Sequence, residues 1–186
     1  MIPTALPRLL LIAGTGRDSG KTAFICHVIK QFKDTVPLVA IKISSHRHKF
    51  LPGGKVVIQD DHFTIIEEND AQTGKDSSRM LAAGASRSFF VMATDEQLVK
   101  AIDKIINLNG SDTYYICESG GLRQYVVPGV FILVSHHGEN QRKQRPSGFT
   151  GFPDAMITFD GQQHQFNRNR IIIAENSWKI KSDDNL

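Results

Sequence analysis

Short, wholly apolar runs alternate along the chain with segments whose apolar residues recur at helical spacing. Residues 9–13 form the first apolar run, and residues 22–33 carry apolar side chains at Ile25, Val28 and Ile29. Apolar runs of this kind are typical of strands buried on both faces of a sheet. Spacings of three and four residues indicate one face of a helix. The pattern therefore predicts a strand over residues 9–13 and a helix over residues 22–33.

The same alternation continues to the end of the chain. Further strands are predicted over residues 37–43, 89–93, 114–117, 130–134, 155–159 and 171–174, and further helices over residues 77–83 and 94–110. Asp76 is the expected N-cap of the first of these helices, and Thr94 begins a capping box, Thr-Asp-Glu-Gln, at the second. Repeated strand–helix–strand units predict an α/β fold with a doubly wound, mostly parallel sheet and helices on both faces.

One stretch, about residues 46–74, breaks this rhythm. Two β-rich runs, residues 55–59 and 62–67, flank the acidic pair Asp60 and Asp61. This arrangement predicts a β-hairpin inserted after the second strand. The sequence contains no linker, repeat or low-complexity tract, so residues 1–186 are expected to form a single domain.

A glycine-rich segment lies between the first predicted strand and the first predicted helix. Residues 14–22 read Gly-Thr-Gly-Arg-Asp-Ser-Gly-Lys-Thr. Glycines let backbone N–H groups point at phosphate oxygens, and a helix start adds the positive end of its dipole. The segment therefore predicts a phosphate loop that binds a nucleoside triphosphate. Lys21 is expected to reach the β- and γ-phosphates, and the Thr22 hydroxyl to hold Mg²⁺. The predicted nucleotide contacts are Gly14, Thr15, Gly16, Arg17, Asp18, Ser19, Gly20, Lys21, Thr22 and Ala23.

Polar residues also follow the second and fourth predicted strands, where ligands bind in such sheets. Lys42 lies at the end of the second strand and is either a phosphate or carboxylate contact or a solvated lysine. Glu118 follows the fourth strand and is either a Mg²⁺ ligand, a carboxylate that orients water, or a turn residue. His46 and His48 are either loop histidines or phosphate contacts.

Composition narrows the classes of function. The net charge of +3 is too small to indicate nucleic-acid binding, and no apolar run approaches the length of a membrane span. The two cysteines, Cys26 and Cys117, lie inside apolar runs, which indicates buried thiols rather than a disulfide or a metal site. Unpaired cysteines favour a reducing compartment, so a cytoplasmic protein is expected.

Three segments resemble the molybdopterin-guanine dinucleotide biosynthesis protein B (MobB) family. They are the predicted phosphate loop, residues 40–48 (Ala-Ile-Lys-Ile-Ser-Ser-His-Arg-His) and residues 74–85 (Gly-Lys-Asp-Ser-Ser-Arg-Met-Leu-Ala-Ala-Gly-Ala). The resemblance implies a dimeric, GTP-binding P-loop NTPase with weak GTPase activity at most. It also implies an accessory role beside the guanylyltransferase that joins GMP to molybdopterin. It supports phosphate and Mg²⁺ roles for Lys21 and Thr22, and implies a site rim formed by Lys42, His46, His48 and Asp76.

Other features resemble dethiobiotin synthetase. The first glycine of the loop lies one residue earlier than in the standard phosphate loop, and Glu118 opens a Glu-Ser-Gly-Gly-Leu segment. Ile43 stands where the MobB pattern has histidine. This resemblance implies an ATP-dependent ligase in which Lys42 holds the transferring phosphate. A nucleotide-dependent interaction module is a third alternative. No Asn-Lys-x-Asp motif is present, so GTP and ATP both remain open. Under the enzymatic hypotheses the candidate catalytic residues are Lys21, Lys42 and Glu118, and the candidate Mg²⁺ ligands are Thr22 and Glu118.

Overall fold

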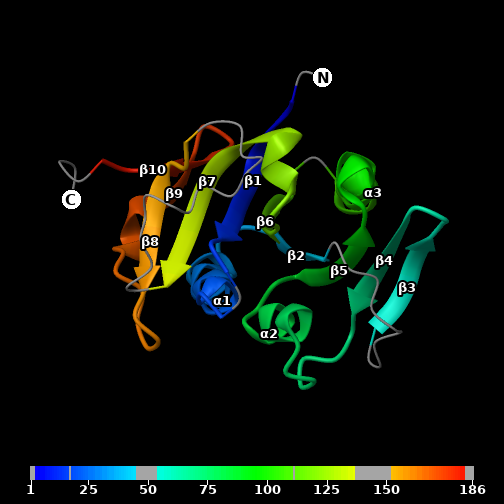
Figure 1. The fold of residues 1–186 in the computed structure, drawn as a ribbon, viewed down its shortest axis with the longest axis horizontal. Coiled ribbons are helices and arrows are strands. Elements are labelled where there is room, and N and C mark those ends of the chain that lie inside the picture. The colour runs from blue at the N-terminus through cyan, green and yellow to red at the C-terminus, as the bar shows by residue number, and fades with distance from the viewer. Residues whose placement is uncertain (1–2, 17, 45–53, 111, 137–151, 183–186) are drawn as a thin grey trace.

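The computed structural model describes residues 3–16, 18–44, 54–110, 112–136 and 152–182. Its centre is an eight-stranded sheet in the order β3-β4-β5-β2-β6-β1-β7-β8 (Figure 1). The strands are β1 (Thr4–Gly14), β2 (Leu38–Ser44), β3 (Gly54–Gln59), β4 (Phe63–Glu68), β5 (Arg87–Ala93), β6 (Tyr114–Glu118), β7 (Val126–His136) and β8 (Ala155–Phe159). The α-helices are α1 (Lys21–Phe32), α2 (Asp76–Ala82) and α3 (Leu98–Asn109).

The sheet is mostly parallel, as the alternation of strands and helices predicts. Each neighbouring pair from β5 through β2, β6, β1 and β7 to β8 is parallel. The predicted hairpin is present as β3 and β4, which pair antiparallel, and β4 continues antiparallel onto β5. The inserted hairpin therefore extends the parallel sheet at one edge.

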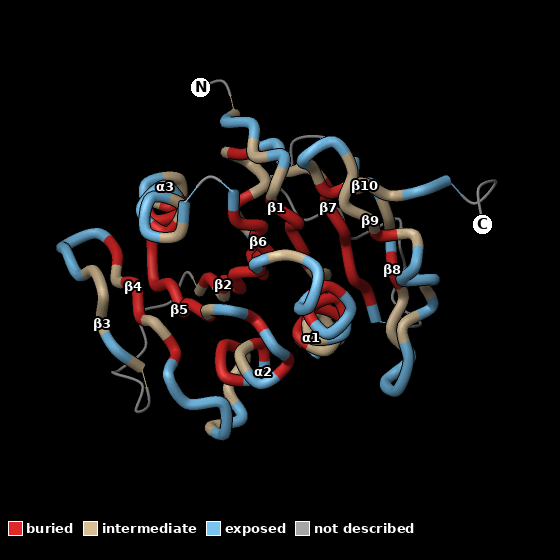
Figure 2. The backbone as a smooth tube through the Cα atoms, turned by 180° about the vertical axis from the view of Figure 1, so that it is seen from behind, coloured by how far each residue is buried: buried red, intermediate tan, exposed pale blue. Residues whose placement is uncertain are grey.

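Helices cover both faces of the sheet, so the chain has the layers of a doubly wound α/β fold. Figure 1 shows α1 and α2 on one side of the central strands and α3 on the other. Side chains of β1 alternate between two buried clusters. Leu9 and Leu11 pack with α3, whereas Leu10 and Ile12 pack with α1. Over residues 9–13 both faces of β1 are thus buried (Figure 2), which explains the continuous apolar run there.

The last predicted strand exists but lies outside the main sheet. Residues 171–174 form β9 (Ile171–Ala174), which pairs only with β10 (Ser177–Ile180) in a two-stranded antiparallel sheet. Trp178 fixes this small sheet against the face that carries α1. Its indole is fully buried, donates to the carbonyls of Arg8 and Tyr115, and lies edge-on to the Phe32 ring. Burial of one large aromatic therefore anchors the C-terminal hairpin.

Two predicted helix starts are wrong in detail. Asp76 is the first residue of α2, not its N-cap: Lys75 occupies that position, and its side chain makes no capping hydrogen bond. The Asp76 carboxylate lies instead on the Lys42 ammonium, whose charge attracts it more strongly than a backbone N–H. At Thr94 the chain tightens into a 3₁₀ turn, so the Gln97 N–H bonds to the Thr94 carbonyl and no capping box forms.

The cysteine prediction is confirmed in its main point. Cys26 and Cys117 are both free thiols. Cys117 is fully buried, and burial raises its thiol pKa far above the ordinary range. Cys26 is only half-buried on α1, because one side of that helix faces solvent. Neither thiol has the depressed pKa of a reactive cysteine.

Candidate functional site

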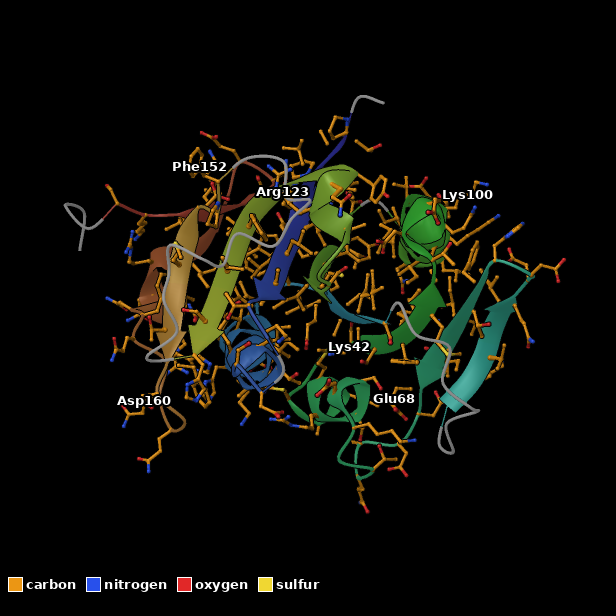
Figure 3. The ribbon with its side chains drawn as sticks, in the orientation of Figure 1. Lys42, Glu68, Lys100, Arg123, Phe152 and Asp160 are labelled. Carbon is orange, nitrogen blue, oxygen red and sulfur yellow. The ribbon has the colours of Figure 1, made fainter. Side chains whose placement is uncertain are left out.

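A cleft of about 880 Å³ lies where β1, β2 and β6 reach their carboxyl ends. The stretches of the chain that converge there include the predicted phosphate loop before α1, the end of β2, the start of α2 and the turn after β6. Figure 3 labels Lys42 at the end of β2, on the side of the sheet that carries α1 and α2. The volume falls in the range of small-molecule sites, which is roughly 300–1,000 Å³.

Tight packing gives the predicted phosphate loop its shape. Gly20 is the N-cap of α1 with a positive φ of 83°, a conformation that costs glycine nothing. A Cβ at Gly14 would come within 2.6 Å of both Ser19 Oγ and Lys21 Cδ. The backbone N–H of Thr15 donates to the Val134 carbonyl of β7 at 3.1 Å. A larger residue would thus be strained at Gly20 and would displace the Ser19 or Lys21 side chain at Gly14, in keeping with the sequence pattern.

Lys21 bends back over the loop. Its ammonium donates to the Gly16 carbonyl at 2.6 Å and to Ser19 Oγ at 3.0 Å. Burial lowers the pKa of Lys21, and the Glu118 carboxylate offsets this only in part. The ammonium is partly desolvated and its protein partners are neutral oxygens, so an anion entering the loop would find a positive charge already aimed inward.

Four side chains form one charged cluster on the floor of the cleft. The Thr22 hydroxyl donates to Glu118 Oε2 at 2.8 Å, and Lys42 Nζ lies 2.6 Å from Glu118 Oε1. Lys42 Nζ also lies 2.8 Å from Asp76 Oδ2. The exposed fraction of the side chain rises outward, from 5% for Glu118 to 19% for Lys42 and 36% for Asp76. Lys42 is therefore shared between a buried and a half-exposed carboxylate.

The two carboxylates keep Lys42 charged. Burial lowers the pKa of Lys42, but the charge of Glu118 and the hydrogen bonds that Lys42 donates to both carboxylates outweigh it, so the pKa lies above its ordinary value. Burial likewise raises the pKa of Asp76, yet the hydrogen bond and charge of Lys42 bring it below its ordinary value. The pair is ionised at neutral pH.

The donor set fits a Mg²⁺ ion held jointly by protein and nucleotide. Among the described residues, no three His, Cys, Asp or Glu side chains are grouped to hold a metal by themselves. Mg²⁺ in nucleotide sites, however, takes only one or two protein oxygens and completes its shell with phosphate and water. The Thr22 hydroxyl and Glu118 Oε2 are two adjacent oxygens of this kind.

Most predicted site residues converge on this cleft. The residues that line it and belong to the predicted set are Gly14, Gly16, Asp18, Ser19, Gly20, Lys21, Thr22, Ala23, Lys42, Asp76 and Glu118. Thr15 is not among the lining residues, because its backbone faces β7. Arg17, His46 and His48 lie outside the described residues.

The structure adds lining residues that the sequence did not single out. Arg79 of α2 lines the cleft with its Nη1 3.8 Å from Asp76 Oδ1, and Asp95, Leu98 and Gln124 line it as well. Phe159 lies at the carboxyl end of β8, next to the loop. The rule that ligands bind at the carboxyl ends of parallel strands applies to Phe159, which ends a predicted strand. No local signal marks the others.

The fold and the cleft thus define an α/β protein with a cationic loop beside an acidic cluster. A scan of the chain against protein-family models and searches of curated proteins and of solved structures gave no significant match. In the described residues no helix combines the length and the apolar character that crossing a membrane demands.

Proposed function

We propose that this protein binds a nucleoside triphosphate together with Mg²⁺ in the cleft, as a member of the P-loop NTPase class. One observation carries the proposal. From the first turn of α1, Lys21 reaches back over the glycine-rich loop while Thr22, the next residue, meets the Glu118 carboxylate at 2.8 Å. A cation and a hydroxyl–carboxylate pair at one helix start match the needs of a polyphosphate and its metal.

Each side chain has a definite part in this proposal. Lys21 would exchange its bond to the Gly16 carbonyl for phosphate oxygens, because a charge-assisted hydrogen bond is the stronger one. Thr22 and Glu118 would hold Mg²⁺, which neutralises charge on the phosphates. Lys42 is fixed by Glu118 and Asp76 and would stabilise negative charge at the terminal phosphate. Hydrolysis by this set is expected to be weak without further groups.

The pathway proposal follows from the resemblance of residues 40–48 and 74–85 to the MobB family. We propose GTP as the nucleotide and an accessory role in molybdopterin guanine dinucleotide biosynthesis, with a guanylyltransferase and a second copy of the chain as partners. The cluster of Lys42 with Asp76 supports it, because the two similar segments supply these residues to one site.

Phosphoryl transfer by an ATP-dependent ligase is the second candidate. It is supported by the cleft of about 880 Å³, which Asp95 and Gln124 line as well as the loop and Lys42, and which so offers room for a second substrate beside the phosphates. Lys42 would lie between the two ligands. In that case small amines and carboxylates should stimulate phosphate release, which an accessory GTP-binding protein would not show.

Calorimetric titration with GTP and with ATP, each with and without Mg²⁺, tests the proposal. Micromolar, Mg²⁺-dependent binding, about −8 kcal/mol, is the expected result. Preference for GTP would favour the accessory role and justify co-purification with a molybdopterin enzyme. Preference for ATP would favour the ligase. Absence of binding to either nucleotide would refute the proposed function.

A further inference from the structure

His164 contacts the start of α1 from the far end of the chain. Its Nε2 lies 2.9 Å from the Gly20 carbonyl, 144 residues away in sequence. The same carbonyl accepts the Phe24 backbone N–H at 3.0 Å, the first hydrogen bond of the helix. Since a carbonyl oxygen can only accept, His164 Nε2 must carry a proton and donate. Burial lowers the pKa of His164, so the donor at neutral pH is the uncharged imidazole.

A rigid turn holds the imidazole in place. Asp160 Oδ1 accepts the backbone N–H groups of Gln162 and Gln163, at 2.8 and 2.7 Å. The turn brings His164 back against Phe159, with ring centroids 4.7 Å apart and the two residues joined by an isolated β-bridge. The Phe24 ring packs edge-on against His164 at 5.2 Å. The position of the His164 imidazole is therefore fixed by contacts with both β8 and α1.

Gly20 is closed in by the same two rings. A Cβ on Gly20 would lie 2.6 Å from Phe159 Cγ and 2.9 Å from His164 Nε2. In the described residues, no side chain caps α1 at this point. The imidazole does not cap the N–H groups of the helix; its bond to the Gly20 carbonyl holds from outside the peptide unit at which the helix begins.

We propose that His164 is a positioning residue for the phosphate loop. By donating to the Gly20 carbonyl and packing on Phe159, it holds the turn before Lys21 in the conformation that receives a polyphosphate. This inference rests on the proposed nucleotide binding and deepens it. It assigns the turn after β8, residues 160–164, to the support of the anion site rather than to contact with the nucleotide, whereas Phe159 itself lines the cleft.

Three variants test the proposal. His164→Leu removes the donor and keeps apolar bulk, and should weaken binding of Mg²⁺-nucleotide about three- to tenfold, the effect of one hydrogen bond. His164→Gln retains an amide donor at a similar reach and should bind within about twofold of wild type. His27→Gln is the matched control. His27 is on the exposed side of α1 and does not line the cleft, and its ring centroid lies 6.0 Å from that of His164. Binding should therefore be unchanged in this variant.

Two readouts separate positioning from other roles. Tripolyphosphate, which has no base or ribose, should lose as much affinity in His164→Leu as the nucleotide does; a loss confined to the nucleotide would overturn the proposal. Amide hydrogen exchange over residues 21–24, measured without ligand, should accelerate in His164→Leu and recover in His164→Gln. Equal exchange in all variants would also overturn it. Failure of the wild-type protein to bind either ligand would instead refute the proposed function.

Discussion

Lys42 and Glu118 are register partners on the neighbouring parallel strands β2 and β6, and their side chains meet in an ion pair of 2.6 Å. Glu118 is the more buried partner, with only 5% of its side chain exposed. A buried carboxylate is costly without a counter-charge, so the floor of the cleft depends on this lysine. The adjacency of the two strands produces the pair, and the pair in turn orients the oxygen that meets Thr22.

Replacing Lys42 with methionine should destabilise the protein by about 2–4 kcal/mol, because breaking a buried ion pair leaves an unpaired charge behind. Urea unfolding measures the loss, followed by the fluorescence of Trp178, the single and fully buried tryptophan. Lys33→Met is the control, since Lys33 pairs with Asp34 at an exposed position. That change should cost less than about 1 kcal/mol. Equal losses would show that Glu118 does not need Lys42.

Lys21→Ala should weaken triphosphate binding at least tenfold, since each charge-assisted contact is worth about 1.5–3 kcal/mol. The fold should persist, because the hydrogen bonds that Lys21 donates within the described residues go to Gly16 and Ser19 of its own loop. Calorimetry gives the affinity, and circular dichroism checks the fold. Lys30→Ala, on the exposed side of the same helix, is the matched control and should bind normally. Unchanged affinity in Lys21→Ala would rule out the phosphate-loop assignment.

Glu118→Gln should show how much of the nucleotide affinity depends on Mg²⁺. The amide keeps the shape of the side chain but loses the charge that favours Mg²⁺, so binding with Mg²⁺ should weaken while binding without Mg²⁺ stays nearly constant. Titrations with and without EDTA provide the comparison. Glu67→Gln, on β4 and outside the cleft lining, should alter neither. Equal weakening in both conditions would mean that Glu118 acts only through packing.

Stability should fall on the acid side of neutrality. Hydrogen bonding to Arg87 lowers the pKa of Glu67, and Lys42 outweighs burial in lowering that of Asp76. A carboxylate whose pKa is lower in the folded state stabilises the protein at any pH above its ordinary pKa. The ordinary pKa values are 4.5 for Glu67 and 3.8 for Asp76. That contribution is lost as pH falls through the lower folded-state values. The part of the stability that these two carboxylates contribute should therefore be lost below about pH 4.5, as a further decline of the urea midpoint. The decline should be shallower in Asp76→Asn and Arg87→Met; an unchanged slope in both would contradict this account.

Local patterns in the sequence determined the elements and the loop. A strand buried on both faces must be apolar throughout, as residues 9–13 are, and α1 shows its buried side at Ile25, Val28 and Ile29. The glycines of the predicted phosphate loop also follow from local constraints: Gly14 faces the side chains of Ser19 and Lys21 a few residues further on, and Gly20 has the positive φ of its position at the helix start. Such constraints act within one turn or one strand, so the residues that satisfy them form a pattern that can be recognised in a short segment of the sequence.

The tertiary structure alone decided which distant residues meet. Strand order places β2 beside β6, which joins Lys42 to Glu118 across 76 residues, and brings His164 to Gly20 across 144. It also gave Asp76 a lysine partner in place of a helix cap and kept β9 out of the main sheet. These outcomes depend on how whole layers of the structure pack together and on which charged residues that packing makes neighbours. No short segment of the sequence contains this information.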